Sequence, residues 1–407
     1  MSVEVIKLKK AGNLDLVRRL NTSIILEALK SSEPMTRNDL AKATGLSSPT
    51  VTKITNDLIE LGIVQDIGTR DSSGGRPPSL IELNKDGGFV VGVNIGNTHI
   101  TSIAVNFAGE IIKNISNPLP SCVNDLSILS TTLSTIAETI SSLKKTRSQL
   151  FGIGVGVFGN VDPEEGIIIH ASNISWENVP IRSILADAYN VPIYVDESTR
   201  LLCFAEKWFG SAKQFENILC LRIGDDIDAC LMLNGQHFGG SQNLACNRIH
   251  KIVISEKNEY SNGTIGSLLT TQAIANHITY CLSTSDRPSK LRDISDLSYK
   301  TLVQVANSGD PLAESILDDA ARHLAALVNN ICRVADPEIV IIGGGLAKAD
   351  STFFTAFHNH LLEFSDGDFD NLMVIPSMLN DDAYAIGAAG ILLHHIFSNP
   401  LSFSSRN

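Results

Sequence analysis

The stretch Ser48-Pro-Thr-Val-Thr-Lys-Ile-Thr-Asn-Asp-Leu-Ile-Glu-Leu61 carries the start signal of a helix and one apolar stripe. Ser48 is expected to be the N-cap, because its hydroxyl can accept a bond from an orphan amide of the first turn. Pro49 then takes the first helical position, where its missing N–H costs nothing. The apolar residues recur at helical spacing, at Val51, Ile54, Leu58 and Leu61. This pattern predicts an amphipathic helix.

The opposite face of this expected helix is polar and carries no acid before Asp57. Short hydrogen-bonding side chains and a single cation favour a helix that lies in the major groove of DNA. The residues that would face the DNA are Ser48, Thr50, Thr52, Lys53 and Asn56. An ordinary amphipathic helix with a polar outer face is the alternative that this stretch alone leaves open.

The residues before this stretch predict a second, shorter helix joined to it by a glycine turn. Thr36 with Asp39 three residues later forms a capping box, and Gly45 follows as the turn. Short helix, glycine turn and second helix make a helix-turn-helix. A preceding helix is expected from about residue 13 to 31, with one apolar side formed by Leu16, Val17, Leu20, Ile24, Ile25 and Leu29. Candidates for phosphate contacts, or simply for solvated surface charge, are Arg18, Arg19 and Lys42.

Two β-like runs after Gly62 indicate a wing. They cover residues 63–67 and 80–83, and a polar loop rich in Gly and Pro separates them. The loop contains Gly74-Gly-Arg-Pro77, an extended and slender segment that presents the guanidinium of Arg76. Arginine is attracted by the negative potential of a narrow minor groove, so Arg76 is expected to bind there.

The charge of the chain is unevenly distributed. Of 32 Lys and Arg residues and 44 Asp and Glu residues, 11 and 10 lie in residues 1–84, which leaves 21 basic and 34 acidic residues in the remainder. The net charge of the whole chain is −12, so residues 1–84 carry +1 and the remainder carries −13. If the protein binds DNA, we expect residues 1–84 to do so and the acidic remainder to face elsewhere.

Composition excludes several other classes of protein. No run approaches the roughly 18 apolar residues of a membrane helix, and no apolar region precedes a cleavage site at the N-terminus. Seven scattered cysteines without a C-x-x-C indicate reduced thiols. We expect a cytoplasmic protein without membrane contact.

From Phe89 the pattern changes to α/β. Strands are expected at 89–93, 151–158, 191–195, 218–223, 229–233 and 338–342, and helices at 126–143, 201–209, 312–335 and 383–396. Strand, glycine turn and helix recur twice, which favours two α/β lobes. The domains expected are 1–84, a winged helix-turn-helix; 85–200, a first lobe completed by a C-terminal helix at about 381–398; and 201–380, a second lobe with the dimerisation and effector region.

Four motifs of this α/β part occur in the order typical of one family. They are Asn94-Ile-Gly-Asn-Thr98, Gly152-Ile-Gly-Val-Gly-Val-Phe-Gly159, Ala205-Glu-Lys-Trp-Phe-Gly210 and Asp336-Pro-Glu-Ile-Val-Ile-Ile-Gly-Gly-Gly-Leu346. Residues 13–396 thus resemble the ROK family of repressors and sugar kinases, in its regulator branch. The resemblance implies a two-lobed fold of the actin-like, ribonuclease H-like ATPase type. It also implies a homodimer or tetramer on palindromic double-stranded DNA operators, controlled by a sugar or sugar phosphate.

The chain departs from the family's kinases where phosphoryl transfer needs a metal, phosphate cradles and a base. Asn94 replaces an aspartate in the first turn, and Ser198, which cannot act as a general base, stands where the catalytic aspartate is expected. Asp225, Asp226 and Asp228 replace residues of a glycine-rich phosphate loop, and like charges so close to a phosphate cost kilocalories. We therefore expect no catalytic residues and no cofactor.

The family's zinc site is also missing from the sequence. His250 is kept, but the cysteine positions read Tyr260, Asn262 and Ser267, so no metal is expected. The family's sugar contacts map to five positions of this chain. Four of them can still bond a sugar hydroxyl, namely Asn173, Ser198, Asn247 and His250, whereas Leu269 replaces a glutamate. Loss of the carboxylates predicts weaker sugar binding or another effector.

The residues favour a DNA-binding transcriptional regulator, and the resemblance implies that it controls genes of carbohydrate uptake or metabolism, most simply as a repressor. An ATP-dependent sugar kinase with an attached DNA-binding domain is the alternative. A third hypothesis is an interaction protein whose acidic lobes bind a protein partner, such as a sugar-transport component.

Overall fold

The computed structural model describes residues 14–398 apart from 32, 70–78, 120–124, 144–148, 172–173, 242–244, 247, 349–350, 370 and 380–381. The chain forms two compact units. The first contains Met1–Asp196 and Ala388–Asn407, and the second contains Glu197–Gly387. Within the described ranges, none of the helices combines the length and the hydropathy that crossing a membrane requires.

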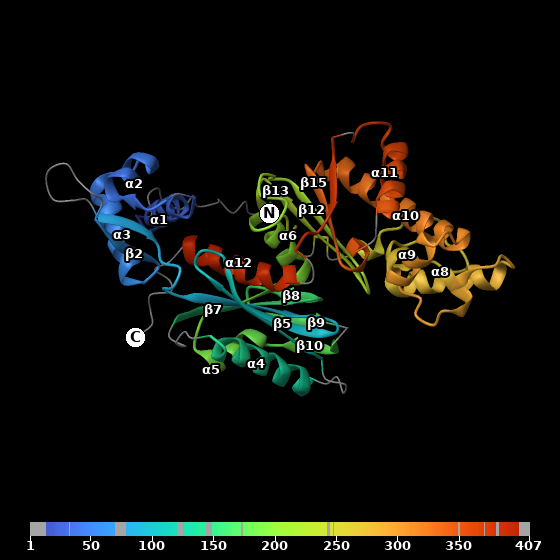
Figure 1. The fold of residues 1–407 in the computed structure, drawn as a ribbon, viewed down its shortest axis with the longest axis horizontal. Helices are drawn as coiled ribbons and strands as arrows, with labels where there is room; N and C mark the ends of the chain where they lie inside the picture. The colour runs from blue at the N-terminus through green and yellow to red at the C-terminus, as the bar shows by residue number, and fades with distance from the viewer. Residues whose placement is uncertain are drawn as a thin grey trace, which may run out of the picture. The chain divides into compact units, whose positions relative to one another are not determined.

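Unit 1 begins with a winged helix-turn-helix (Figure 1). Its helices are α1 (Leu14–Ser31), α2 (Arg37–Thr44) and α3 (Ser48–Glu60). A sheet of order β1-β3-β2 accompanies them, formed by β1 (Met35–Thr36), β2 (Val64–Thr69) and β3 (Ser79–Leu83). The predicted helices and the antiparallel wing strands are confirmed, and the wing loop at 70–78 lies outside the described residues.

The caps of the two helices of the turn confirm one prediction and correct another. The capping box is present, because the Thr36 hydroxyl accepts from the Asp39 amide at 3.1 Å and the Asp39 carboxylate accepts from the Thr36 amide at 3.3 Å. The N-cap of α3, however, is Ser47, whose hydroxyl accepts from the Thr50 amide at 3.4 Å. Ser48 is the first helical residue. Ser47 and Ser48 are both suitable N-cap residues, because serine is favoured at that position. Only the backbone geometry shows which of the two is the cap.

The buried stripe of α1 differs from the predicted one. Ile25, Leu26 and Leu29 are buried together with Thr22, which is the i, i+3, i+4, i+7 pattern of a helix face. Leu20, which we expected on this face, is 60% exposed because it falls outside that spacing. On α3 the predicted stripe is confirmed at Val51, Ile54 and Leu58, which are all buried. Its fourth member, Leu61, is the half-buried C-cap residue that follows the helix.

The rest of unit 1 is built on a five-stranded sheet of order β11-β7-β4-β5-β6. Its central strand β4 is buried along its whole length, so its sequence reads as a continuous apolar run and not as an alternating one. Helix α4 (Asp125–Ser141) packs on β5 and β6. The strands are β4 (Phe89–Ile95), β5 (His99–Asn106), β6 (Ile111–Pro118), β7 (Leu150–Val157) and β11 (Ile193–Glu197).

The glycines of β7 explain how the C-terminal helix completes this unit. Residues 388–398 of α12 (Ala383–Ser398) lie on the face of the sheet opposite α4 (Figure 1). A Cβ on Gly154 would lie 2.0 Å from the Ala388 carbonyl oxygen, and one on Gly152 would lie 2.8 Å from a methyl group of Leu392. The missing side chains therefore let the helix backbone lie directly on the strand.

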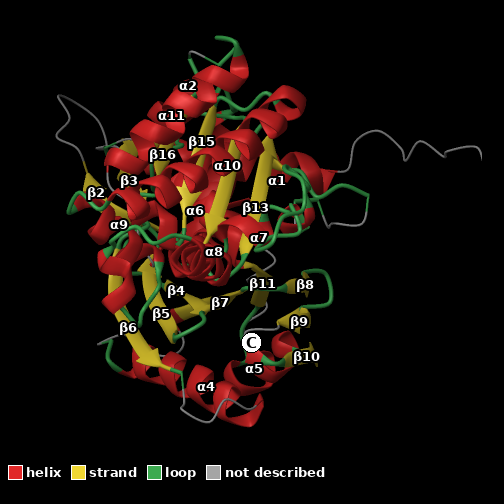
Figure 2. Ribbon diagram, turned by 90° about the vertical axis from the view of Figure 1, so that its right-hand side faces the viewer, coloured by secondary structure: helices red, strands yellow, loops and turns green. Residues whose placement is uncertain are grey.

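A small sheet of order β10-β9-β8 and helix α5 (Ile181–Tyr189) also belong to unit 1 (Figure 2). Its strands are β8 (Asn160–Asp162), β9 (Ile167–Ala171) and β10 (Trp176–Val179). The sequence did not predict them, because strands of three to five residues show too little periodicity.

Unit 2 has its own five-stranded sheet, of order β14-β13-β12-β15-β16. Successive residues of β12 point to opposite faces. Cys220 packs in a cluster with Cys203 of α6, while Leu219 packs in a cluster with Leu324 of α10. The strands are β12 (Ile218–Ile223), β13 (Ile227–Leu233), β14 (Gln236–His237), β15 (Ile339–Gly343) and β16 (Met373–Pro376).

The helices of unit 2 surround this sheet. The longest, α10 (Pro311–Ala335), is capped by Asp310 and packs against α9 and α11. The others are α6 (Ser198–Trp208), α7 (Gly266–Leu269), α8 (Thr271–Thr284), α9 (Tyr299–Asn307) and α11 (Ser351–Ser365), with short 3-10 helices η3 (Ile249–Lys251), η4 (Lys290–Asp293) and η5 (Gly345–Lys348). The strands and helices predicted for this part are confirmed, while the domain limits at 84, 200 and 380 stay predictions.

Candidate nucleic-acid interface and effector residues

Helix α3 exposes the polar face that the sequence predicted. Ser48, Thr52, Lys53 and Asn56 are exposed, and Thr50 is half-buried. The two threonine hydroxyls are already engaged locally. The Thr52 hydroxyl donates to the Ser48 carbonyl at 2.8 Å, and the Thr50 hydroxyl lies 2.8 Å from that of Ser47. The amide of Asn56 and the ammonium of Lys53 are therefore the strongest candidates for new bonds.

Arg37, which no motif in the sequence singled out, contacts α3. Its Nη2 donates to Asn56 Oδ1 at 3.0 Å and its Nε donates to Thr55 Oγ1 at 3.1 Å. Because Asn56 accepts through its oxygen, its amide nitrogen remains available as a donor on the outer face. The geometry fits an amide whose orientation is fixed before it meets a ligand.

The basic candidates differ in their surroundings. Arg18 Nη2 lies 2.7 Å from Asp57 Oδ2, so this guanidinium is held beside α3 with its other N–H groups available. Lys42 is exposed in the last turn of α2. The side chain of Arg19 and the whole of Arg76 lie outside the described residues.

The turn between α2 and α3 depends on Gly45. This residue has φ +69°, and a Cβ there would meet nothing within 4 Å among the described residues. Glycine is needed at this position for its backbone conformation, because a left-handed backbone is unfavourable for a residue with a side chain. The turn brings the two helices of the motif together.

In unit 2, two of the four predicted effector residues are described. Ser198 is fully buried at the first position of α6, and His250 is half-buried in η3. Among the described residues, the Nδ1 atom of His250 is buried and makes no hydrogen bond. Asn173 and Asn247 lie outside the described residues.

In the acidic loop of unit 2, residues 224–228, the carboxylates of Asp226 and Asp228 are bonded to groups of the protein itself. Asp228 forms an ion pair with the buried guanidinium of Arg222, and Asp226 Oδ1 accepts from the Ile227 amide at 2.8 Å. The Gly224 amide donates to the Asp226 carbonyl at 3.1 Å. A phosphate would need such amides free and a site without carboxylates. The partner of Asp228, Arg222, had not been identified from the sequence.

Glu197 lies beside this loop and caps α6. Its carboxyl oxygens accept from the amides of Thr199 at 2.8 Å and Arg200 at 3.1 Å. Burial, followed by the charge of Asp228, raises the pKa of Glu197 to about 8. Burial thus favours the uncharged acid, while the two amide bonds fix the carboxyl at the start of α6.

Side-chain hydrogen bonds stabilise the loop at residues 260–267, where the resemblance places the zinc ligands of the family. Asn262 Oδ1 accepts from Ser267 Oγ at 2.7 Å and from Thr264 Oγ1 at 2.8 Å. The ring of Tyr260 stacks on that of His277, with centroids 4.1 Å apart. The side chains that replace the cysteines therefore form a network of their own.

Two family profiles match this chain, and together they span both of its parts. The profile of the winged helix-turn-helix DNA-binding family matches residues 18–65, and that of the ROK family matches residues 90–395. The chain belongs to the ROK family. The ROK resemblance that the four motifs indicated is confirmed.

Curated relatives of this ROK protein match along nearly the whole length. The xylose repressor of Caldicellulosiruptor bescii is 26% identical over 395 residues, which cover 96% of this chain and 99% of that protein. The DNA-binding transcriptional dual regulator NagC of Escherichia coli K12 is 28% identical over 400 residues, which cover 95% and 98%.

Solved structures agree with the fold. The crystal structure of a ROK family transcriptional regulator, a homologue of the E. coli MLC protein, has a TM-score of 0.83 at 23% identity and covers 96% of this chain and 99% of its own. A ROK family glucokinase from Streptomyces griseus has a TM-score of 0.64 at 19% identity and covers 75% and 99%. The predicted fold, a winged helix-turn-helix followed by the ROK fold, is confirmed.

Proposed function

We propose that this ROK protein is a DNA-binding transcriptional repressor of genes for carbohydrate uptake or metabolism, acting in the cytoplasm. One observation carries the proposal: α3 exposes Lys53 and an Asn56 whose orientation Arg37 fixes, within a winged helix-turn-helix. The names of the full-length relatives, a xylose repressor and NagC, support the same function.

The proposed contacts follow from the chemistry of each side chain. Ser48, Thr50, Thr52, Lys53 and Asn56 read base edges in the major groove, Asn56 through its amide, which suits adenine. Arg76 enters the minor groove, and Arg18, Arg19 and Lys42 bind phosphates. A homodimer or tetramer on a palindromic operator follows from the symmetry of such sites.

The proposed control is a sugar or sugar phosphate bound by Asn173, Ser198, Asn247 and His250. The Nδ1 atom of His250 supports it, because this buried nitrogen has no hydrogen-bond partner among the described residues, and a ligand hydroxyl would recover the free energy that this costs. A protein partner remains the second proposed route of control.

We also propose that the chain is not a sugar kinase. The internal ion pair of Arg222 with Asp228 supports this, since it occupies the loop in which a phosphate would be cradled. Ser198 also supports it, because a serine stands where the resemblance places the catalytic aspartate. Incubation with ATP and a panel of hexoses and amino sugars should give no turnover above background. Phosphoryl transfer to any of them would contradict this part of the proposal.

DNA binding is tested with the promoter fragment beside the protein's own gene. The parent protein should shift it specifically, and Lys53→Ala and Arg76→Ala should each weaken the complex. Lys300→Ala is the matched control, because Lys300 is an exposed lysine of α9 in unit 2. A parent protein that gives no sequence-specific shift would refute the proposal.

A further inference from the structure

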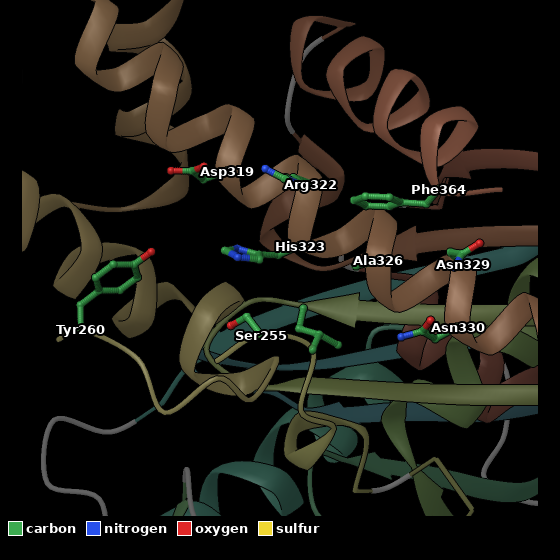
Figure 3. A pocket seen from close by; sticks show the side chains of 10 residues that line it. Ser255, Tyr260, Asp319, Arg322, His323, Ala326, Asn329, Asn330 and Phe364 are labelled. Atoms are coloured by element: carbon green, nitrogen blue, oxygen red, sulfur yellow. The ribbon is translucent and has the colours of Figure 1, made fainter. Parts of the chain in front are cut away.

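Unit 2 contains a pocket of about 550 Å³ along one face of α10 (Figure 3). This volume falls within the range of roughly 300–1,000 Å³ of small-molecule sites. Ser198 and His250, the two described effector candidates, are not among the residues that line it. Helix α10 supplies Asp319, Arg322, His323, Ala326, Asn329 and Asn330, and the facing wall is formed by Ile254, Ser255, Tyr260 and Phe364.

The α10 residues of this pocket form a polar stripe. They follow one another at intervals of three and four residues, so they lie on one face of the helix. From Asp319 to Asn330 the stripe is about 16 Å long, at 1.5 Å per residue. Other faces of the same helix bury leucines in the core. The polar stripe faces the segment around Tyr260, and it also faces Phe364 of α11.

One polar atom of the stripe lacks a partner. In the part of the chain that the structure describes, the Oδ1 atom of Asn329 is buried and accepts no hydrogen bond. Such an acceptor carries the full cost of its desolvation until a donor reaches it. The pocket beside it gives a ligand access to that atom.

The opposite end of the pocket is held in place by side-chain contacts. Tyr260 stacks on His277 with an angle of 7° between the rings. The Nε2 atom of His277 lies 3.8 Å from Asp319 Oδ2. The positions of the ring and of the carboxylate are therefore set before a ligand binds.

The charges of the stripe favour an uncharged ligand. Asp319 and Arg322 contribute one charge of each sign, so a lone anion or a lone cation would meet one of them unfavourably. Burial, followed by the charges of His277 and Arg322, lowers the pKa of His323 to about 4. At neutral pH its imidazole therefore offers one donor and one acceptor.

Hydroxyl groups fit this set because each both donates and accepts. A hydroxyl can donate to Asn329 Oδ1 or to Asp319, and it can accept from Arg322. Phe364, Ala326 and Ile254 provide apolar wall for the C–H face of a ring. A carbohydrate combines these two kinds of surface in one molecule.

We propose that this pocket binds a neutral mono- or disaccharide, with hydroxyl groups bonded to Asn329, His323 and Arg322. It is a second small-molecule site, distinct from the effector residues proposed above, and it does not depend on DNA binding.

The test is calorimetric titration of the full-length protein with D-xylose, D-glucose, N-acetyl-D-glucosamine and maltose at millimolar concentrations, with L-serine as a zwitterionic comparison. At least one sugar should bind. Asn329→Leu and Arg322→Ala should each raise its Kd roughly tenfold, since each removes one hydrogen bond to the sugar. Ser315→Ala, an exposed position of α10 outside the pocket, should keep this binding.

Three results would overturn the proposal. One is the absence of heat from every sugar, including the case in which only L-serine binds. Another is binding that neither pocket variant changes. The third is binding that only His250→Ala removes, which would place the sugar at the proposed effector residues and leave the proposed function intact. Because Arg322 is exposed, Arg322→Ala keeps the test valid if Asn329→Leu lowers the melting temperature.

Discussion

Asn56 and Arg37 form the most specific arrangement on the exposed face of α3. The guanidinium of Arg37 holds the amide oxygen of Asn56 at 3.0 Å and Thr55 Oγ1 at 3.1 Å. An amide fixed in this way loses less conformational freedom when it bonds a base edge, so it discriminates between bases more sharply. We therefore expect Arg37 to affect DNA recognition through Asn56.

Asn56→Ala should weaken binding to the specific operator by about 1–3 kcal/mol and leave non-specific binding unchanged, because the amide reads a base and not a phosphate. Arg37→Ala should cause a smaller loss. In the Asn56→Ala background, Arg37→Ala should add little, since its effect passes through the missing amide. Fluorescence anisotropy with operator and scrambled duplexes measures all four proteins. Equal and additive losses would contradict the coupling.

Glu197 makes the stability of unit 2 depend on pH. The pKa of its carboxyl is raised from 4.5 to about 8, mainly by burial. The unfolded state therefore releases this proton at lower pH than the folded state, and the group's contribution to stability falls as the pH rises through this window. Glu197→Gln, which resembles the protonated acid, should melt at an increasingly higher temperature relative to the parent protein between about pH 5 and 8. A difference in melting temperature that stays constant over this range would contradict the raised pKa.

The hydrogen-bond and ion-pair partners of individual side chains were the feature that the sequence predicted least well. The sequence identified Asn56 and Asp228, because each stands within a motif. It missed Arg37, which is 19 residues from Asn56, since no local rule predicts a bond over that separation. Arg222 was missed for another reason: it faces Asp228 across paired strands, and the register of β12 and β13 had to be known first.

The contact of β7 with α12 requires a glycine for lack of space. A comparison of Gly154→Ala with Gly45→Ala, where only the backbone conformation requires glycine, tests this. Gly154→Ala would place a Cβ 2.0 Å from the carbonyl oxygen of Ala388, so strand and helix must move apart. Gly45→Ala meets no atom within 4 Å and costs only the left-handed conformation, about 1–2 kcal/mol. Gly154→Ala should therefore lower the free energy of unfolding by more. Chemical denaturation of both variants measures this, and a smaller loss for Gly154→Ala would contradict the close packing.

Long periodic elements were predictable and short ones were not. The helix expected at 312–335 is observed at 311–335, because its apolar residues repeat through seven turns and Pro follows the Asp cap. Strands β8, β9 and β10 span five residues or fewer and were not predicted. The start of α3 was predicted one residue late, since Ser47 and Ser48 are chemically identical as caps.

The complete chain combines a nearly neutral DNA-binding region with acidic lobes. Residues 1–84 hold 11 basic and 10 acidic residues, whereas the net charge of the whole chain is −12. The lobes therefore repel the phosphate backbone, and the attraction is confined to the winged helix-turn-helix. The sequence predicted this division and the fold, but the candidate effector site only in part, since Asn173 and Asn247 lie outside the described residues.

The central claim is that α3 reads a specific operator, and the ratio of two dissociation constants tests it most directly. The Kd of the full-length protein is measured at one fixed salt concentration on the promoter fragment beside its gene and on a scrambled duplex of equal length. We predict that the promoter binds roughly a thousandfold more tightly or better. Lys53→Ala with Asn56→Ala should reduce this ratio sharply, and Lys300→Ala should preserve it. A ratio near one for the parent protein would contradict the claim.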